Sequence, residues 1–345
     1  MRKDGRNVAG PAGHRGVIGC LAGGFELLGR NLLLLALPVV LDAVLWLGPR
    51  VSIAPILLRF TQLLEMQPAA DAQMTSQIAQ ATDLLERLAG QFNLLSVLGA
   101  VPVLQVPSLL ARRGGSGRSP LGEPRVFSLS SPFAVIPWWA GLLLAGIALG
   151  FLYLNEIAHQ VETLPAYSEN PVGKSVVTDP VTANGFGQNS IRMFARFLLF
   201  ALGMVVAAFS VLSLWLIVVA MGTLIAQSVG ILLWMAGVGL VSYAALHLVF
   251  VVPGLLLGNR RLLQAVGESV LLSHIHLSSV VGLVVLAAVI YEGLAFAWSL
   301  PSSDSWALLI GIAGNAAVAT GLTGAAFLFY RERMMPADSV SEGID

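Results

Sequence analysis

Cysteine is nearly absent from this sequence of 345 residues, since Cys20 is the only one. A single cysteine excludes an intramolecular disulfide and a metal site built from clustered cysteines. The sequence also lacks a phosphate-binding P-loop, the Gly-x-Ser-x-Gly elbow of hydrolases and the glycine-rich fingerprint of dinucleotide-binding domains. No motif therefore points to a catalytic centre, and we expect no enzymatic activity, no cofactor and no metal.

Charge is scarce as well. Asp, Glu, Lys and Arg make up 11% of the chain, against about 25% in soluble domains. The 19 basic and 19 acidic residues cancel, so no net charge attracts the chain to nucleic acid, and we expect none as a partner. Hydrophobic residues make up 56% of the sequence, which predicts an integral membrane protein whose main partner is the lipid bilayer.

Six apolar runs meet or approach the ~20 residues that a helix needs to cross a ~30 Å hydrocarbon core. The predicted spans cover residues 31–47, 133–155, 197–221, 229–252, 279–300 and 306–330. The first run is short by itself, so we expect it to borrow residues from the helix before it. The sequence therefore predicts an all-α fold, a polytopic transmembrane helical bundle of six spans with interfacial amphipathic helices.

The last two spans set the predicted orientation. Their connecting turn, Pro301–Ser305, has no Lys or Arg, whereas Arg331 and Arg333 follow the final span. Under the positive-inside rule the turn lies outside and the C-terminus inside. Alternating six spans from a cytoplasmic N-terminus also places all seven tryptophans near the outer side, where Trp favours the interface. We expect a multi-pass protein of the plasma (inner) membrane with both termini cytoplasmic.

Three regions follow from this threading. Residues 1–30 form a basic cytoplasmic segment that ends in an interfacial helix, residues 31–330 form the membrane domain, and residues 331–345 form a cytoplasmic tail. A second interfacial helix is expected over residues 260–278, because its apolar residues recur at helical spacing.

The interval 50–132 forms an outer amphipathic and re-entrant region. Asp71–Ala89 carries apolar residues on one side and predicts a surface helix. Phe92–Leu110 is apolar enough to enter the membrane, but Pro102 and Pro107 interrupt it. We interpret that piece as interfacial or re-entrant, and a true span is the alternative.

Glycine is abundant, with 36 residues. Gly146 and Gly150 lie four apart in the second predicted span, a signature of close packing between helix pairs. Glycine-rich helix faces of this kind also suggest a protein partner or homo-oligomerisation.

Asp42, Glu292 and Asn315 are the polar residues that stand out inside the predicted spans. At 1.5 Å per residue they lie at a similar depth, just outside the midplane. A carboxylate in hydrocarbon is costly and usually faces protein or water, so we expect Glu292 to face the bundle interior near Asp42 or Asn315. Together they suggest a polar cavity for an ion, a proton or a lipid headgroup. In the alternative, Glu292 is neutral and bonded within the bundle and Asp42 reaches the outer interface.

Two stretches carry a family resemblance. An interfacial helix leads into Arg-Asn-Leu-Leu-Leu-Leu-Ala-Leu-Pro at residues 30–38, and the last span ends in Phe-Tyr-Arg-Glu-Arg at residues 329–333. This arrangement resembles uncharacterised bacterial multi-pass membrane proteins, and its layout is similar to the membrane domain attached to some glycerophosphodiester phosphodiesterases. The resemblance covers the spans only and includes no catalytic domain, so it implies no activity.

Three functions follow, in order of preference. The missing motifs favour a non-enzymatic scaffold, an assembly factor or a partner subunit. The alternative is a small transporter or lipid-handling protein that uses a polar cavity around Asp42, Glu292 and Asn315. An intramembrane enzyme rests only on scattered His and Glu residues and ranks last.

Single cysteines at Ser303, Ser175 and Ser116, in a Cys20→Ser background, test the predicted topology. An impermeant thiol reagent on intact cells should label positions 303 and 116, which are predicted outside, and should leave position 175 unlabelled. Labelling at position 175 would overturn the orientation.

Overall fold

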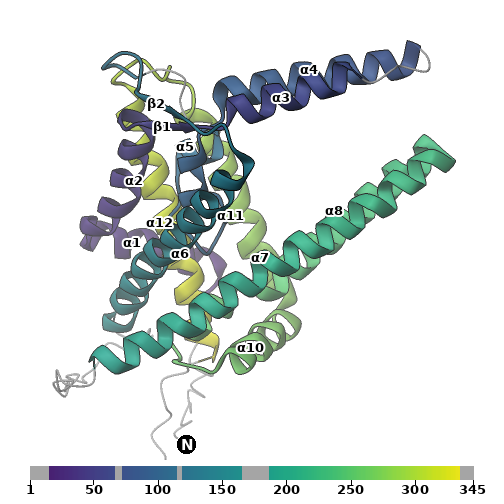
Figure 1. The fold of residues 1–345 in the computed structure, drawn as a ribbon. Coiled ribbons are helices and arrows are strands. Elements are labelled where there is room, and N and C mark those ends of the chain that lie inside the picture. Colours follow the sequence, from purple (N-terminus) through teal and green to yellow (C-terminus); the bar gives the residue numbers. More distant parts are fainter. Residues whose placement is uncertain (1–14, 67–71, 115–118, 165–185, 335–345) are drawn as a thin grey trace, which may run out of the picture. The chain divides into compact units, whose positions relative to one another are not determined.

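The computed structural model describes residues 15–66, 72–114, 119–164 and 186–334. Helices make up nearly all of the regular structure in these ranges (Figure 1), so the prediction of an all-α helical bundle is confirmed. The predicted N-terminal segment up to residue 14, most of the C-terminal tail, and the single positions Asp71, Ser116 and Ser175 lie outside the described residues.

Twelve α-helices, two short 3-10 helices and two short strands are present in the described part of the chain. The α-helices are α1 (Val17–Arg30), α2 (Ala36–Leu47), α3 (Ala54–Glu65), α4 (Ala72–Gln91), α5 (Leu109–Arg112), α6 (Pro132–Thr163), α7 (Phe186–Ile225), α8 (Gln227–Leu248), α9 (Val251–Leu256), α10 (Leu262–Ile275), α11 (Leu277–Trp298) and α12 (Leu308–Met334). The 3-10 helices are η1 (Leu32–Leu35) and η2 (Leu94–Gly99). The strands β1 (Arg50–Ser52) and β2 (Val126–Ser128) pair in parallel.

Five helical stretches are long and apolar enough to cross a membrane, namely α6, α7, α8 with α9, α11 and α12. These correspond to five of the six predicted spans. The remaining one, residues 31–47, is formed by η1 and α2, which follow α1 after a bend of 94°. The number of possible membrane spans in the described residues is therefore five, or six if α1 and the bent continuation formed by η1 and α2 make up one span. The length and hydropathy of these helices are those of a membrane protein.

The chain divides into two compact units. Unit 1 comprises residues 1–27, 157–286 and 321–345, and unit 2 comprises residues 28–156 and 287–320.

In unit 1, small residues let helices approach closely. A Cβ on Gly24 of α1 would overlap the backbone of Gly321 and Ala325 in α12, so only glycine fits at this crossing. The break between α8 and α9 is closed from α10, where the Ser269 hydroxyl donates to His247 O at 2.6 Å and accepts from Phe250 N–H at 3.2 Å. These bonds satisfy backbone groups that the interrupted helix leaves unpaired.

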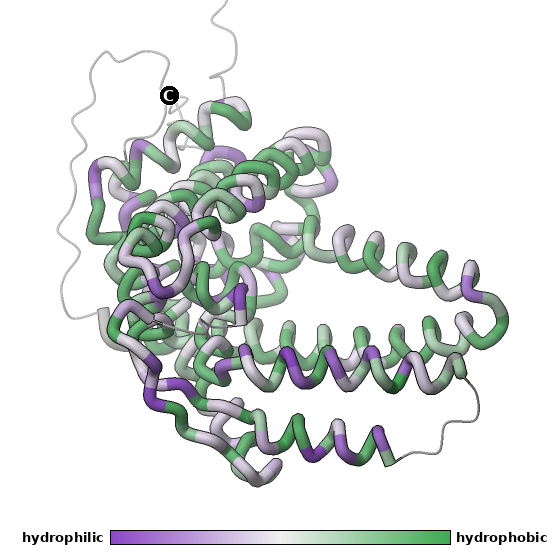
Figure 2. Tube along the Cα trace, turned by 90° about the horizontal axis from the view of Figure 1, so that it is seen from above, coloured by the Kyte–Doolittle hydropathy of each residue, from purple (hydrophilic) through white to green (hydrophobic). Residues whose placement is uncertain are grey.

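The α7–α8 hairpin of unit 1 is held by similar means. The Trp215 indole N–H donates to Leu233 O at 3.2 Å, and its ring lies against Gly237. The hairpin is hydrophobic along nearly its whole length in Figure 2. Outside this pairing most of its large apolar side chains are exposed.

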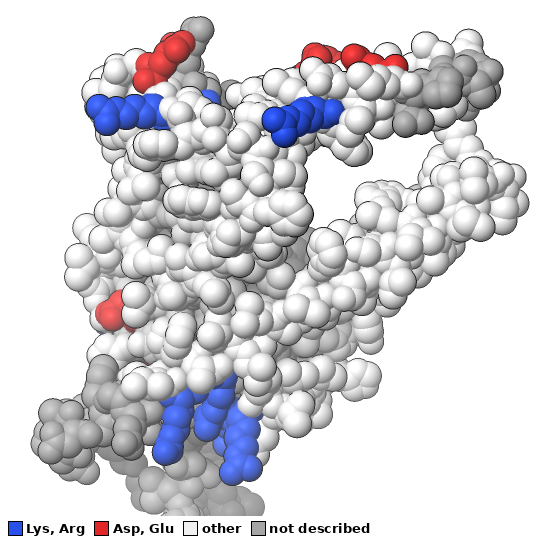
Figure 3. Space-filling view, in the orientation of Figure 1, with Lys and Arg blue, Asp and Glu red and all other residues white. Residues whose placement is uncertain are grey.

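In unit 2, α3 and α4 form an amphipathic hairpin with mixed hydropathy (Figure 2). Acidic side chains follow its upper edge in Figure 3. Helix α4 matches the surface helix predicted for Asp71–Ala89, and most of its side chains are exposed.

The piece predicted as interfacial or re-entrant contains η2, turns and the start of α5, with no helix long enough to cross. It packs against α6 at Gly146 and Gly150, where added Cβ atoms would overlap Gln105 and the carbonyls of Leu98 and Leu104. The close-packing pattern is therefore used, but its partner is this irregular backbone and not a second helix. Without side chains at these positions, the carbonyls can approach the helix surface.

Gly150→Ala should lower the free energy of unfolding by about 1–3 kcal/mol, because the new methyl group overlaps the Leu104 carbonyl. Gly141→Ala in the same helix is the matched control, since nothing lies within 4 Å of a Cβ there. That control should be neutral or stabilising by up to about 1 kcal/mol through helix propensity. The measurement is SDS-titrated unfolding of the purified protein in detergent, and equal stability of the two variants would rule out this packing.

Candidate functional site

The three predicted site residues lie in unit 2 on different helices. Asp42 is in α2, Glu292 in α11 and Asn315 in α12. Asp42 and Glu292 each bond to the same short segment, residues 108–112, rather than to one another.

Asp42 is fully buried at the start of α5. Its carboxylate accepts hydrogen bonds from the Ser108 hydroxyl and from the N–H groups of Leu109 at 3.0 Å and Leu110 at 3.1 Å. Ser108 is the N-cap of α5, and its hydroxyl oxygen accepts from Ala111 N–H at 2.9 Å. The first N–H groups of a helix have no partner within the helix. The carboxylate supplies one, and these three donors in turn compensate its burial.

Glu292 pairs with the other end of α5. Both of its carboxylate oxygens lie 2.7 Å from Nη2 of Arg112, whose guanidinium lies 4.8 Å from the centroid of the Tyr291 ring. Burial alone would lower the pKa of Arg112, but the interactions with Glu292 and Tyr291 together outweigh burial, and the pKa is raised.

The position of Glu292 differs from the sequence expectation. We expected it in the bundle interior beside Asp42 or Asn315, whereas 63% of its side chain is exposed and its partner is Arg112. The physical reason is that a basic residue comes from outside the spans. Arg112 offers a full opposite charge, which an amide or a second carboxylate cannot.

Arg113, like Arg112, links the end of α5 to α11. Its guanidinium donates to Ser299 O at the end of α11. Its pKa lies below the ordinary value because burial disfavours the cation, and the charge of Asp42 offsets part of that effect. In the turn that follows, Ser303 O accepts from the Trp46 indole N–H at 2.7 Å, so α2 and α5 are both tied to the connection between α11 and α12.

Residues 93–114 form one irregular segment that contains η2 and α5. Its beginning is held by Asn93, which is fully buried. Its side-chain oxygen accepts from Val51 N–H at 3.1 Å and from Leu95 N–H at 3.2 Å. Its own N–H donates to Gly114 O at 2.9 Å, which brings the two ends of the segment together.

The middle of the segment contains a strained turn. Val103 has φ of +66°, a conformation that β-branched residues rarely adopt. Gln105 closes the turn, because its side-chain oxygen accepts from Val101 N–H at 2.8 Å and its amide nitrogen lies 3.5 Å from Leu143 O of α6. Strain of this kind persists only where surrounding contacts enforce it.

Asn315 is buried, and neither atom of its amide head has a hydrogen-bond partner among the described residues. It shares a helix face with Gly311 and Gly314, against which Trp298 packs. The Trp298 indole nitrogen is likewise buried without a partner in the described part of the chain. Unlike Asp42 and Glu292, Asn315 therefore keeps its full hydrogen-bonding capacity.

The chemistry available at this site is limited. Within the described ranges, no three His, Cys, Asp or Glu residues group as metal ligands. Asp42 is fixed by three donors and is not free to act as a mobile base. The arrangement positions backbone in the interior of unit 2. Among the three predicted site residues, Asn315 is the one whose polar atoms have no partner within the described residues.

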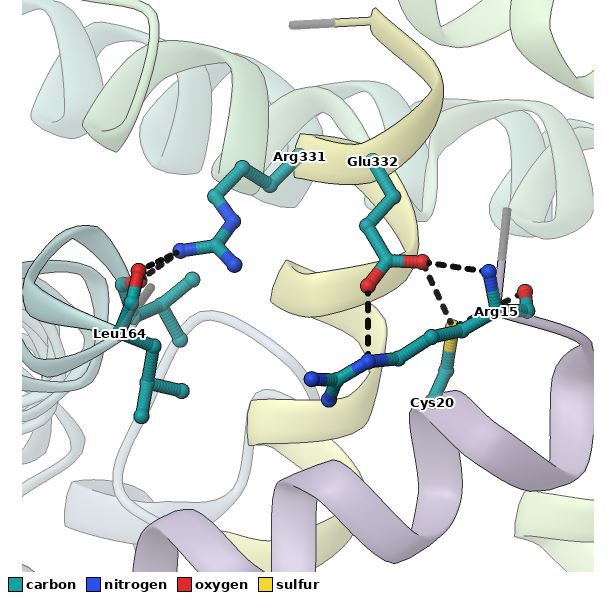
Figure 4. Close-up of polar contacts among 6 residues, drawn as sticks. Arg15, Cys20, Leu164, Arg331 and Glu332 are labelled. Atoms are coloured by element: carbon teal, nitrogen blue, oxygen red, sulfur yellow. Dashed lines mark hydrogen bonds and ion pairs between the residues drawn. The ribbon is translucent and has the colours of Figure 1, made fainter. Parts of the chain in front are cut away.

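A second polar cluster joins helices in unit 1 (Figure 4). Glu332 of α12 accepts from Arg15 N–H at 3.0 Å and pairs with Arg15 Nε at 3.2 Å, and the Cys20 sulfur lies 4.0 Å from the same carboxylate. The neighbouring Arg331 donates to carbonyls at the end of α6, including Leu164 at 3.0 Å. In the sequence, Arg331 indicates only the orientation of the last span, and no sequence spacing reveals these partners.

No protein-family model, curated protein or solved structure matches this chain. The resemblance drawn from residues 30–38 and 329–333 therefore stays a prediction.

Asp42→Ala should lower the free energy of unfolding by about 3–5 kcal/mol, because the N–H groups at the start of α5 lose a buried charged acceptor. The control is Asp83→Asn, which removes an exposed ion pair with Arg87 on α4 and should cost at most about 0.5 kcal/mol. SDS-titrated unfolding in detergent measures both. If Asp42→Ala is no worse than the control, the carboxylate does not hold α5.

Proposed function

We propose that this protein is a non-enzymatic scaffold, assembly or partner subunit, and that it associates with a second copy of itself through the α7–α8 hairpin. The observation that carries the proposal is the uncovered apolar surface of that hairpin. None of the 18 most apolar consecutive residues of α7 is buried within the protein, whereas 61% of the corresponding residues of α12 are buried.

The length of α7 supports a protein partner over lipid alone. Its stretch Ser190–Ile225 has 36 residues, which is about 54 Å at 1.5 Å per residue. Without the first seven residues, which include two arginines, about 44 Å of apolar helix remain. To fit ~30 Å of hydrocarbon such a helix needs a tilt of about 45°, and tilt is set mainly by packing against neighbouring helices.

Open glycines support a helix partner at this surface. Gly203 of α7 and Gly239 of α8 are exposed, and nothing lies within 4 Å of a Cβ at either position. The glycines that hold the hairpin together, among them Gly237, are already in contact. Small exposed residues let the backbone of another helix approach, and self-association is the commonest form of oligomer.

The hydrogen bonds that the two carboxylates already make support the same proposal. Asp42 and Glu292 are used to hold residues 108–112, so neither is available as the mobile proton carrier that a transporter would need. A small transporter or lipid-handling protein is the second candidate. It is favoured by the unpartnered amide of Asn315 and by the strained turn at Val103, which lies between η2 and α5.

We further propose a location in the plasma (inner) membrane with both termini cytoplasmic. Support comes from the sequence, through the arginines at residues 331 and 333 and the turn 301–305 without basic residues. The likeness to uncharacterised bacterial multi-pass membrane proteins is part of this proposal and carries no activity with it.

Co-purification of two differently tagged copies from the same membranes tests the association. The wild-type copies should co-purify, and Gly203→Leu with Gly239→Leu should weaken association about ten-fold or more, because the added side chains keep the helices apart. Gly293→Leu in α11 is the matched control, since it is also exposed with nothing within 4 Å of a Cβ. Wild-type copies that never co-purify, or a double variant that associates like the control, would contradict the proposal.

A further inference from the structure

Basic residues gather at one end of unit 1. The cluster consists of two arginines at the start of α7 and two in the turn between α9 and α10, namely Arg192, Arg196, Arg260 and Arg261. Arg196 connects the two pairs, because its Nη1 donates to Asn259 O and Oδ1 at 3.1 Å each and to Arg260 O at 3.3 Å. In Figure 3 basic side chains gather at the lower edge of the view, where Figure 1 draws α10 and the end of α12.

The cluster lies at the boundary of the apolar segments. Arg192 and Arg196 precede the apolar part of α7, and Arg260 and Arg261 follow the apolar stretch of α8 and α9. Since α7 and α8 run antiparallel, both boundaries fall at the same end of the hairpin. This places the four guanidinium groups at headgroup depth, whichever side of the membrane this end faces.

Most of the charge in the cluster is not neutralised. Glu268 pairs with Arg260 at 3.1 Å and also accepts from the Tyr330 hydroxyl at 2.6 Å. Arg192 and Arg261 are exposed, and no ion pair of their guanidinium groups is found within the described residues. The exposed surface therefore keeps at least two free cationic groups of the kind that bind phosphate through paired N–H donors.

Helix α10 adds an apolar surface beside this charge. It has 14 residues, too few to cross a ~30 Å core. Its side chains Leu263, Leu271 and Ile275 are 85%, 52% and 63% exposed. A short helix with exposed apolar side chains next to basic residues is typical of a segment lying in the membrane interface.

We propose that this cluster is a binding site for anionic phospholipid, in which Arg192 and Arg261 bind the headgroup phosphate and the apolar side chains of α10 contact the acyl chains. Arg196 and Arg260 position the turn that presents Arg261. Charge complementarity selects an anionic lipid over a zwitterionic one, since each basic residue near the surface contributes about five-fold in affinity for an anionic membrane. The proposal does not depend on self-association, because the site lies within one copy of the chain.

Thermal unfolding of the purified full-length protein in detergent tests the site, with phosphatidylglycerol, phosphatidylcholine or inorganic phosphate added. Phosphatidylglycerol should raise Tm, and the other two should not. Arg192→Gln with Arg261→Gln should weaken the phosphatidylglycerol effect about 25-fold in concentration. Arg59→Gln with Arg87→Gln, two exposed arginines of the α3–α4 hairpin, is the control and should respond like the wild type.

A charge-preserving variant separates lipid binding from loss of folding. Arg192→Lys with Arg261→Lys should keep most of the phosphatidylglycerol response, and native mass spectrometry should show the lipid retained on this variant and depleted on the glutamine variant. An equal Tm increase with phosphatidylcholine would show binding without charge selection and overturn the proposal. An equal increase with inorganic phosphate would show a free-phosphate site and also overturn it, as would an undiminished response of the glutamine variant.

Discussion

The buried carboxylate of Asp42 is the interaction on which unit 2 depends. In a bilayer no water can satisfy unpaired backbone groups, so non-helical chain inside a membrane protein must find its partners within the protein. Asp42 accepts from the Ser108 hydroxyl and from the first two N–H groups of α5, and so allows a helix of only four residues to begin in the interior. Without this acceptor the segment would expose unpaired donors to an apolar core.

The same requirement explains the other polar side chains of the segment. Asn93 and Gln105 are buried amides whose oxygens accept backbone N–H groups that no helix pairs. Gly146 and Gly150 lack side chains where carbonyls of the segment reach α6. Residues that look out of place in an apolar stretch thus replace the hydrogen bonds that a regular helix would make for itself.

The sequence predicted the parts of this structure that depend on length and periodicity. Five long apolar helices and the amphipathic α4 follow from those patterns alone. The candidate site could be located only in part. Asp42 stands out as a charge in an apolar run, but its partners are mostly backbone N–H groups, which no residue pattern identifies. Arg112 lies in what appears in the sequence as a polar linker, and its partner Glu292 is 180 residues away. The expectation that Glu292 faces inward failed because that long-range pair cannot be predicted from either residue alone.

The spacing of these contacts along the chain orders the biogenesis of unit 2. Asp42 and Ser108 are 66 residues apart, so the ribosome releases both early and α5 can be capped while later helices are still being made. Arg112 and Arg113 must wait for Glu292 and Ser299, 180 and 186 residues downstream. At about 5–20 residues per second this leaves an interval of roughly 10–40 seconds in which two unpaired arginines lie beside an incomplete bundle. The nascent protein therefore passes through a stage in which Asp42 already caps α5 while Arg112 and Arg113 still lack their partners on α11.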